Sequence, residues 1–286
     1  MQYESLRMNP YDSQPEAEDK AQRWPALLVA SLSSFLTPFM LSSVNLALPA
    51  IGSHFQADAV LLSWVATAYL VAAAVALVPV GKLADIHGRK RVFIWGMAIF
   101  TAASLLAGLA WSAAALVAFR VAQGVGIAMV FATGIAIVTS VFPLAERGRV
   151  LGITVAAVYS GLACGPFVGG WLTEALSWRS VFLVPAPLGL GLVLVTSWKL
   201  KGEWTGAAGE RFDIAGAAIY SLAVVALMCG ISGLPALWGG LLVAGGVLLL
   251  ERDRLAVVAV AVGPGAEGAR ARAVPAQGLG AVQVGR

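Results

Sequence analysis

Long apolar segments recur along this chain with only short polar connections between them. A bilayer core of ~30 Å needs about 20 apolar residues per helical span, and eight runs of roughly that length contain few charges. Since backbone polar groups find no water inside a bilayer, such runs must be helical. With 59% hydrophobic and 12% charged residues, the chain is predicted to be an all-α, polytopic membrane protein. The predicted spans are 26–49, 61–80, 92–110, 115–141, 150–172, 180–198, 214–231 and 236–250, the last of them short.

Positive charges alternate between successive connections. The connection 81–91 contains Lys82, Arg89, Lys90 and Arg91, whereas 50–60 contains no Lys or Arg. Because Lys and Arg accumulate on the cytoplasmic side of membrane proteins, the pattern predicts a cytoplasmic N-terminus. The expected location of this multi-pass protein is the plasma membrane. The net charge of +4 therefore indicates membrane orientation, and we expect no nucleic acid partner.

The connections also divide the chain into parts. The segment 199–213 is the longest polar connection between spans, whereas the four residues 232–235 contain Gly and Pro and predict a tight turn. The first residues lack the basic start and adjacent apolar core of a signal peptide. The predicted parts are a cytoplasmic polar tail at 1–25, a six-helix bundle at 26–198, a cytoplasmic linker at 199–213, a two-helix hairpin at 214–250 and a low-complexity tail at 251–286.

The end of the chain has a composition of its own. Of the last 31 residues, 27 are Ala, Val, Gly, Pro or Arg, which offers little to pack and no amphipathic repeat. GC-rich codons read out of frame give these same residue types. Two explanations stay open for 255–286, an aberrant end produced by a frameshift and a natural flexible tail.

Between the second and third predicted spans lies the sequence GKLADIHGRKR, residues 81–91. Gly81 and Gly88 permit a tight reversal between two spans. Asp85 is suited to accept hydrogen bonds or to pair with a cation, and Arg89 and its basic neighbours hold the loop at the cytoplasmic surface. The alternative is an ordinary basic turn.

The fourth predicted span contains RVAQGVGIA, residues 120–128. An Arg inside a bilayer costs about 2.5–3.5 kcal/mol on insertion scales, so Arg120 is expected to face the bundle or a wet cavity. The alternative is that Arg120 extends toward the outer interface near 111–114.

The fifth predicted span contains GLACGPFVGG, residues 161–170. Its glycines flatten one helix face, and Pro166 interrupts the backbone hydrogen-bond ladder. The residues alone predict a bent helix that packs closely against a neighbour.

These motifs resemble three signatures of the major facilitator superfamily. The resemblance implies that the loop gates the cytoplasmic side, that Arg120 takes part in proton coupling, and that the chain exports by antiport. Further similarities over about 25–252 point to the drug and proton antiporter subgroup with fourteen spans, of which this chain would be the N-terminal part. The matching positions are Gly81, Asp85, Gly88 and Arg89 in the loop; Arg120, Gln123, Gly124, Gly126 and Ala128 in the second signature; and Gly161, Gly165, Pro166, Gly169 and Gly170 in the third.

Two positions depart from the family pattern. Ile86 stands where the loop signature commonly has a basic residue, and the first span reads Leu41, Ser42, Ser43 where the subgroup often has an Asp. Asp58 and Glu174 lie at outer ends, where acidic residues are solvated or cap helices, so the coupling ion stays open. The candidate cavity residues, each of which could equally form an interhelical hydrogen bond, are Asn45, Thr67, Tyr69, Gln123, Thr133 and Tyr159.

The sequence does not indicate an enzyme. His54 and His87 fall in loops without partner ligands, and Cys164 and Cys229 lie inside apolar runs, so we expect no metal site and no cofactor. The leading interpretation is a secondary transporter for ion-coupled efflux of small amphipathic or drug-like compounds, with the proton as the expected ion. The alternatives are a truncated, non-transporting membrane fragment and a homodimer of this half-length chain.

Overall fold

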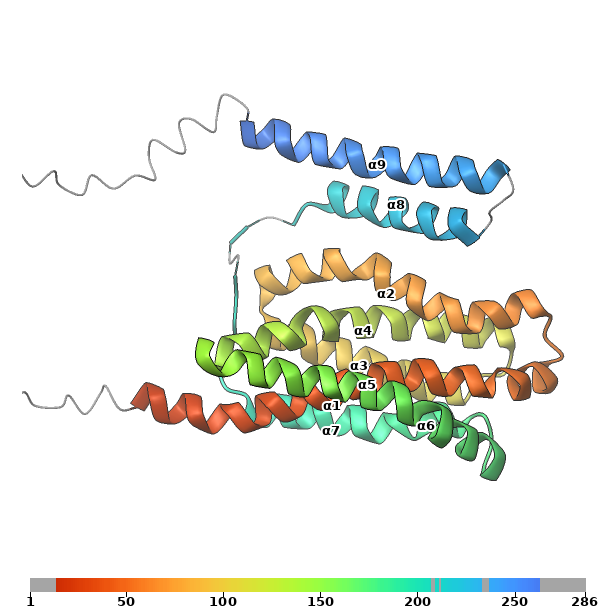
Figure 1. Ribbon diagram of the computed structural model, residues 1–286, viewed down its shortest axis with the longest axis horizontal. Helices are drawn as coiled ribbons and strands as arrows, with labels where there is room; N and C mark the ends of the chain where they lie inside the picture. The colour runs from red at the N-terminus through yellow and green to blue at the C-terminus, as the bar shows by residue number, and fades with distance from the viewer. Residues whose placement is uncertain (1–13, 207–208, 211, 233–236, 263–286) are drawn as a thin grey trace, which may run out of the picture. The chain divides into compact units, whose positions relative to one another are not determined.

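The computed structural model describes residues 14–206, 209–210, 212–232 and 237–262, and within them it contains helices and no strand (Figure 1). This confirms the all-α prediction. The predicted turn at 232–235 lies outside the described residues apart from Ser232. The helices are α1 Gln14–Phe55, α2 Ala59–His87, α3 Arg89–Gly108, α4 Ala113–Val141, α5 Leu144–Ala175, α6 Ser180–Leu183, α7 Pro185–Lys199, α8 Ile214–Ser232 and α9 Leu237–Val262.

Seven helical segments of the described chain are long and apolar enough to cross a membrane. They match the first seven predicted spans, with α6 and α7 together forming the sixth, Ser180–Lys199. The eighth prediction fits less well, since the apolar part of α9, Leu237–Glu251, is shorter than the ~20 residues of a full span. The helix continues to Val262, inside the predicted low-complexity tail, and 263–286 lies outside the described residues.

Helix α1 begins well before its predicted start. It starts at Gln14, inside the segment predicted as a polar tail. Pro15 is tolerated in the first helical turn, and the Glu, Ala, Lys, Gln and Arg residues that follow favour a helix even though they are polar. The helix therefore extends beyond the apolar run that predicted the first span.

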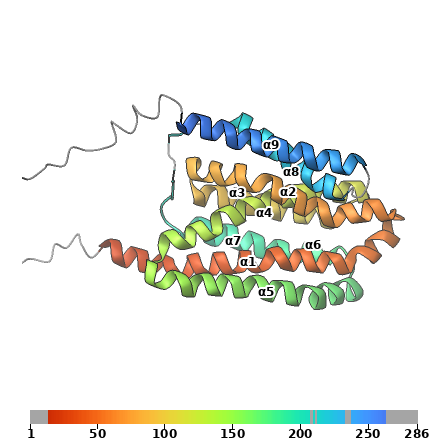
Figure 2. The same cartoon turned by 45° about the horizontal axis from the view of Figure 1, so that its top comes forward.

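The described chain forms two compact units, which meet between Ala217 and Ala218. In the first unit, α1 packs most extensively against α5, and α4 packs against α2 and α3. Figure 2 shows α1 and α5 running side by side. If α1 to α3 and α4 to α7 are taken as two three-helix repeats, with α6 and α7 as one span, the first helix of each repeat packs on the second helix of the other, which is the pairing expected of inverted repeats.

Contacts at the two ends of the first unit join segments that are distant in sequence. At one end, Arg23 at the start of the first span forms an ion pair with Glu146 at 3.0 Å. At the other, Arg179 Nη2 donates to the carbonyl oxygen of Ala110 at 3.1 Å, and Arg179 Nη1 lies 3.4 Å from His54 Nε2. The basic connections predicted to be cytoplasmic therefore gather at the Arg23 end.

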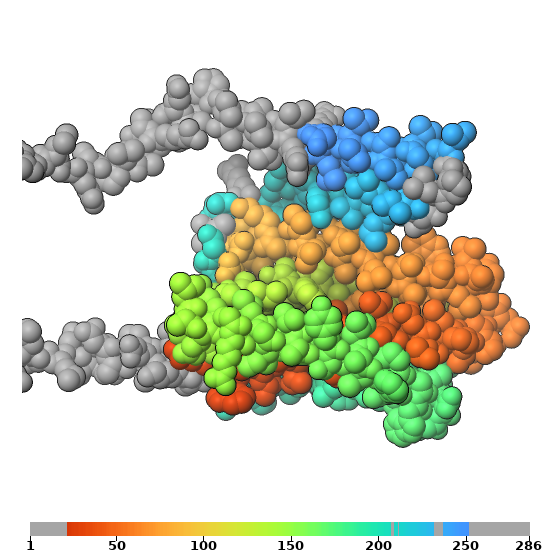
Figure 3. All heavy atoms as spheres, viewed as in Figure 1, coloured from red at the N-terminus to blue at the C-terminus, as the bar shows by residue number. Residues whose placement is uncertain are grey.

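Helices α2 and α5 are the least buried spans of this unit. In their most apolar windows 17% and 22% of residues are buried, compared with 61% in α4. Figure 3 shows α5 at the surface of the unit. Their exposed apolar side chains include Val60, Trp64, Leu70, Leu77 and Val78 on α2, and Val155, Leu162, Phe167 and Trp171 on α5. Such faces suit lipid or another helical partner.

In the second unit, α8 and α9 approach each other at glycines. A Cβ added at Gly230 would lie 2.8 Å from the backbone nitrogen of Val243, and one added at Gly246 would lie 2.9 Å from the carbonyl oxygen of Ala223. Small residues allow this close contact between apolar helices.

Candidate functional site

The first cluster of predicted site residues lies where α2 turns into α3. Gly88 ends α2 and precedes α3 with φ of 109°, a backbone conformation that favours glycine. Its N–H donates to the carbonyl oxygen of Ala84 at 2.9 Å. Gly81 lies about two turns earlier in α2, where an added Cβ would contact the Cβ of Ala132 in α4 at 4.0 Å. The predicted tight reversal is therefore made by Gly88.

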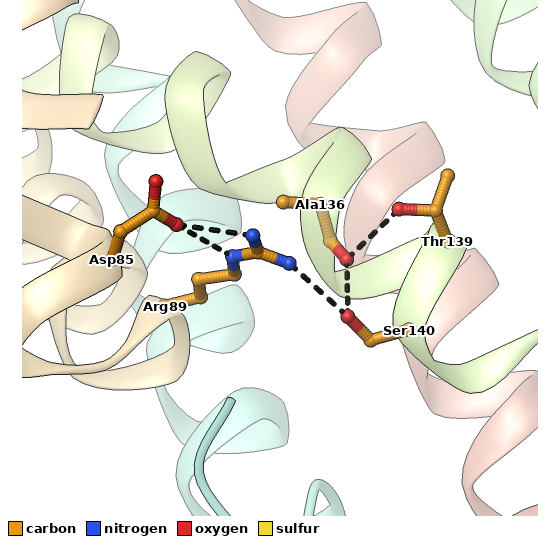
Figure 4. Close-up of polar contacts among 5 residues, drawn as sticks. All are labelled: Asp85, Arg89, Ala136, Thr139 and Ser140. Atoms are coloured by element: carbon orange, nitrogen blue, oxygen red, sulfur yellow. Dashed lines mark hydrogen bonds and ion pairs between the residues drawn. The ribbon is translucent and has the colours of Figure 1, made fainter. Parts of the chain in front are cut away.

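Arg89 connects the end of α2 with the end of α4 (Figure 4). Its Nε and Nη2 atoms donate to Asp85 Oδ1 at 3.1 and 3.0 Å, and its Nη1 donates to Ser140 Oγ at 3.3 Å. Ser140 in turn donates to the carbonyl oxygen of Ala136 at 2.8 Å. Asp85 therefore pairs with a cation, which is one of the two roles expected of it, and Arg89 extends the contact to a hydroxyl that the sequence did not single out.

Arg120 is fully buried, at 0% exposure, so its side chain does not extend to the interface. Its Nε donates to the carbonyl oxygen of Val65 at 2.9 Å, and its Nη1 donates to Gln123 Oε1 at 3.1 Å. The guanidinium carbon lies 4.3 Å from the centre of the Tyr69 ring, close enough for a cation–π interaction. The charge is therefore stabilised by dipoles and a ring rather than by a carboxylate.

The hydrogen-bond chain continues from α4 into α3. Gln123 Nε2 donates to Ser104 Oγ at 2.7 Å, and Ser104 Oγ donates to the carbonyl oxygen of Phe100 at 2.7 Å. Within the described part of the chain, two buried polar atoms of this cluster, Arg120 Nη2 and Tyr69 Oη, have no hydrogen-bond partner. The cluster joins α2, α3 and α4 through polar contacts at one level of the bundle.

The glycines of the second motif allow α4 to approach two helices at once. A Cβ at Gly124 would lie 2.7 Å from the Cβ of Ala72 in α2. A Cβ at Gly126 would lie 2.7 Å from the backbone nitrogen of Phe100 in α3. These close approaches bring Arg120 and Gln123 of α4 against both α2 and α3.

The third motif forms the face of α5 that packs on α1. Gly161, Gly165 and Gly169 are buried along this face, and Ser43 Oγ donates to the carbonyl oxygen of Gly165 at 2.9 Å. A Cβ at Gly169 would lie 2.6 Å from the Cα of Ser43. Pro166 stands inside the helix, and a Cβ at Gly170 would meet no atom within 4 Å. Three of the four glycines therefore serve helix packing.

An apolar cavity of about 340 Å³ opens among α1, α2, α4 and α5. Of the predicted cavity residues, Tyr69 is in its wall. Its lining residues are Thr37, Pro38, Leu41, Tyr69, Leu70, Ala73, Ala74, Leu77, Ile127, Ala128, Phe131 and Val158.

The other predicted cavity residues lie elsewhere. Asn45 and Tyr159 are exposed. Thr67 and Thr133 bond to carbonyl oxygens in their own helices, those of Ser63 at 2.8 Å and Met129 at 2.6 Å.

The acidic residues predicted at outer ends are placed as expected for capping and solvation. Asp58 precedes α2 and accepts a hydrogen bond from the backbone N–H of Leu61 at 2.7 Å. Glu174 is exposed near the end of α5. Among the described residues no group of His, Cys, Asp or Glu is arranged to hold a metal ion.

The family model for the Major Facilitator Superfamily matches residues 30–261. The chain belongs to the major facilitator superfamily. The match covers all three motifs and extends into both units, and the superfamily consists of transporters and is not enzymatic.

Curated relatives in this superfamily are named as exporters and resistance proteins. The chain is 38% identical to the cephamycin export protein CmcT of Amycolatopsis lactamdurans, over 72% of this chain and 43% of that protein. It is 37% identical to the multidrug resistance protein Stp of Mycobacterium tuberculosis, over 71% of this chain and 38% of Stp. It is 34% identical to the lincomycin resistance protein of Streptomyces lincolnensis, over 77% of this chain and 45% of that protein. The chain therefore spans less than half the length of these relatives.

A solved structure supports the fold independently. A bacterial homologue of the human lysosomal transporter Spinster, in an inward-facing and unoccupied conformation, superposes with a TM-score of 0.52 at 17% identity. The alignment covers 81% of this chain and 60% of the other. At this identity the likeness concerns the major facilitator fold alone.

Several residues that complete the superfamily motifs were not predicted. Ser104, Ser140 and Ser43 each accept or donate a hydrogen bond to a motif residue from another helix. Small hydroxyl residues inside apolar spans were the available signal. Glu203 and Trp204 of the linker also bond to the loop at 88–91, and no local pattern around them indicates that contact.

Proposed function

We propose that this chain is the N-terminal bundle and following hairpin of an ion-coupled exporter of small amphipathic or drug-like compounds. The observation that carries the proposal is the combination of an apolar cavity walled by Tyr69 with a fully buried Arg120 directly behind that ring. A charge this costly to bury in a membrane protein marks a functional site. The names of the relatives as export and resistance proteins favour the same direction of transport.

The cavity suggests which compounds this bundle would accept. Its lining contains no Asp or Glu, and the positive guanidinium of Arg120 lies against the ring of Tyr69, which is one of the lining residues. A cation entering the cavity would lose hydration without meeting an opposite charge, whereas a neutral apolar compound would not. We therefore propose that this bundle favours neutral amphipathic compounds over cations.

We propose the proton as the coupling ion and the plasma membrane as the location, with the N-terminus in the cytoplasm. The basic connections that contain Arg23, Arg89 and Arg147 lie at the same end of the unit, and this supports the orientation. The described spans offer no carboxylate at mid-depth, so the proton acceptor of a coupled transporter would lie outside this bundle.

The competing proposal is a membrane fragment that does not transport by itself. The largely unburied apolar faces of α2 and α5 favour it, because in a two-bundle transporter such faces meet a second bundle. A homodimer of this chain would bury the same faces. The two-bundle exporter, the non-transporting fragment and the homodimer differ in their expected transport and crosslinking.

Expression in a drug-sensitive bacterium tests the proposal. We expect the chain to raise tolerance to a neutral amphipathic antibiotic, and Arg120→Ala or Asp85→Asn to remove the increase at equal membrane levels. If tolerance equals that of the empty vector despite good expression, the fragment interpretation holds. Crosslinking of introduced cysteines on α2 or α5 between chains then shows whether transport occurs through a homodimer.

A further inference from the structure

Helix α3 begins without a capping side chain of its own. Gly88 occupies the position before the helix and supplies no side-chain acceptor for the free N–H groups of the first turn. Those groups carry partial positive charge, which an acceptor or an anion at this position stabilises. An acceptor must therefore come from elsewhere in the chain or from solvent.

Glu203 supplies that acceptor from the linker that follows α7. Its Oε1 atom accepts hydrogen bonds from the backbone N–H groups of Lys90 at 2.8 Å and Arg91 at 3.3 Å. Its Oε2 atom lies 3.5 Å from Arg91 Nε, and its side chain is only 25% exposed. A residue 113 positions along the chain thus caps the first turn of α3.

The backbone around Glu203 is bonded to the same loop. The N–H of Arg89 donates to the carbonyl oxygen of Trp204 at 2.9 Å, and the N–H of Gly206 donates to the carbonyl oxygen of Asp85 at 3.1 Å. Lys90 Nζ donates to the carbonyl oxygen of Leu200 at 2.6 Å. The linker segment 200–206 therefore bonds to the loop on both sides of Gly88.

Gly88 is shaped to receive the carboxylate. A Cβ at Gly88 would collide with the Cγ, Cδ and Oε1 atoms of Glu203. The absence of a side chain at Gly88 thus serves two purposes, since it permits the positive φ and makes room for Glu203. The Glu203 side chain therefore lies in van der Waals contact with the backbone of Gly88.

We propose that Glu203 is a positioning residue that holds the 81–91 loop, and with it the Asp85–Arg89 pair, by capping α3. The linker segment 200–206 and the loop then behave as one piece, so a movement of the linker acts on the Asp85 carbonyl and on the first turn of α3 directly. The capping role stands on the contacts themselves. Its consequence for gating rests on the proposed transport function.

Hydrogen exchange of the full chain in detergent micelles tests the capping role. In Glu203→Ala the amides of Lys90 and Arg91 lose a charged acceptor, and we expect their exchange to accelerate about 10-fold or more. Glu203→Asp should restore part of the protection because it keeps the charge. Glu210→Ala is the matched control, since Glu210 pairs with Lys82 at the same end of the unit but does not contact α3.

The results separate this proposal from the proposed function. Unchanged exchange at the amides of Lys90 and Arg91 in Glu203→Ala overturns the capping role, whether or not the chain transports. Faster exchange with partial rescue by Glu203→Asp supports it even if no transport is found. In a transporting chain, Glu203→Ala should also lower the transport rate at unchanged protein levels, with Glu203→Asp intermediate. Full activity of Glu203→Ala would overturn the link to gating.

Discussion

The guanidinium of Arg120 lies 4.3 Å from the centre of the Tyr69 ring, and this ring separates a buried charge from the apolar cavity. No carboxylate offsets the charge within the described spans. A buried charge without a carboxylate partner is costly in a membrane protein, and we propose that Arg120 serves the transport function.

Replacing Arg120 by an apolar residue of similar length should therefore separate stability from transport. We expect Arg120→Met to leave the thermal unfolding temperature unchanged or raised, because a buried charge is removed, and to abolish export. Leu116→Ala, at a fully buried apolar position of the same helix, should lower the free energy of unfolding by about 2–5 kcal/mol. Thermal unfolding in detergent and drug tolerance provide the two readings. An Arg120→Met protein that fails to fold would contradict a functional rather than structural role for Arg120.

The Asp85–Arg89 pair should matter for transport far more than for stability. Its side chains are 40% and 26% exposed, and ion pairs of this kind contribute about 0–1 kcal/mol. We expect Asp85→Asn to change the unfolding temperature little while lowering transport strongly. Glu210→Gln breaks the more exposed pair with Lys82 and should leave both properties unchanged. Equal effects of the two variants on transport would argue against a specific role for the Asp85–Arg89 pair.

The glycines of α5 should differ sharply in their tolerance of a methyl group. Gly165 is buried against Ser42 and Phe39, whereas a Cβ at Gly170 meets open space. We expect Gly165→Ala to destabilise the protein by about 1–3 kcal/mol through overpacking. Gly170→Ala should be neutral or slightly stabilising because alanine favours helices. Size-exclusion chromatography after heating measures both, and equal melting of the two variants would contradict the α1–α5 packing.

The predicted orientation is open to a labelling experiment. In a chain with Cys164→Ser and Cys229→Ser, single cysteines at the exposed positions Ser53 and His87 report opposite ends of the first unit. A membrane-impermeant maleimide added to intact cells should label Ser53→Cys and not His87→Cys. Labelling of His87→Cys alone would invert the orientation, and labelling of both would show leaky cells or mixed topology.

Much of this fold could be predicted because bilayer thickness and backbone hydrogen bonding leave few options to a chain with long apolar runs. The number of helices in the bundle, its basic end and the close packing of α5 all follow from such local patterns. The first turn of α3 could not be predicted in the same way. Its acceptor, Glu203, lies far along the chain in a segment whose composition resembles any polar linker.

The candidate site shows the same division. Its charged residues, Arg120 and Asp85, stand out in the sequence because charges are rare in spans. The partners Val65, Ser104 and Ser140 do not, since a carbonyl or a hydroxyl in an apolar helix becomes informative only when the packing is known. The start of α1 was misplaced because polar helix-forming residues continue the helix beyond its apolar part.

Transport by the purified chain in proteoliposomes tests the central claim most directly. We predict that proteoliposomes containing the wild-type chain take up a neutral amphipathic compound such as chloramphenicol faster than the cation ethidium, each rate being measured relative to protein-free liposomes. We also predict that Arg120→Met abolishes accumulation. Rates equal to those of protein-free liposomes, with correctly folded and inserted chain, would contradict transport by this bundle. Preferred accumulation of ethidium would contradict the proposed role of the uncompensated Arg120 charge.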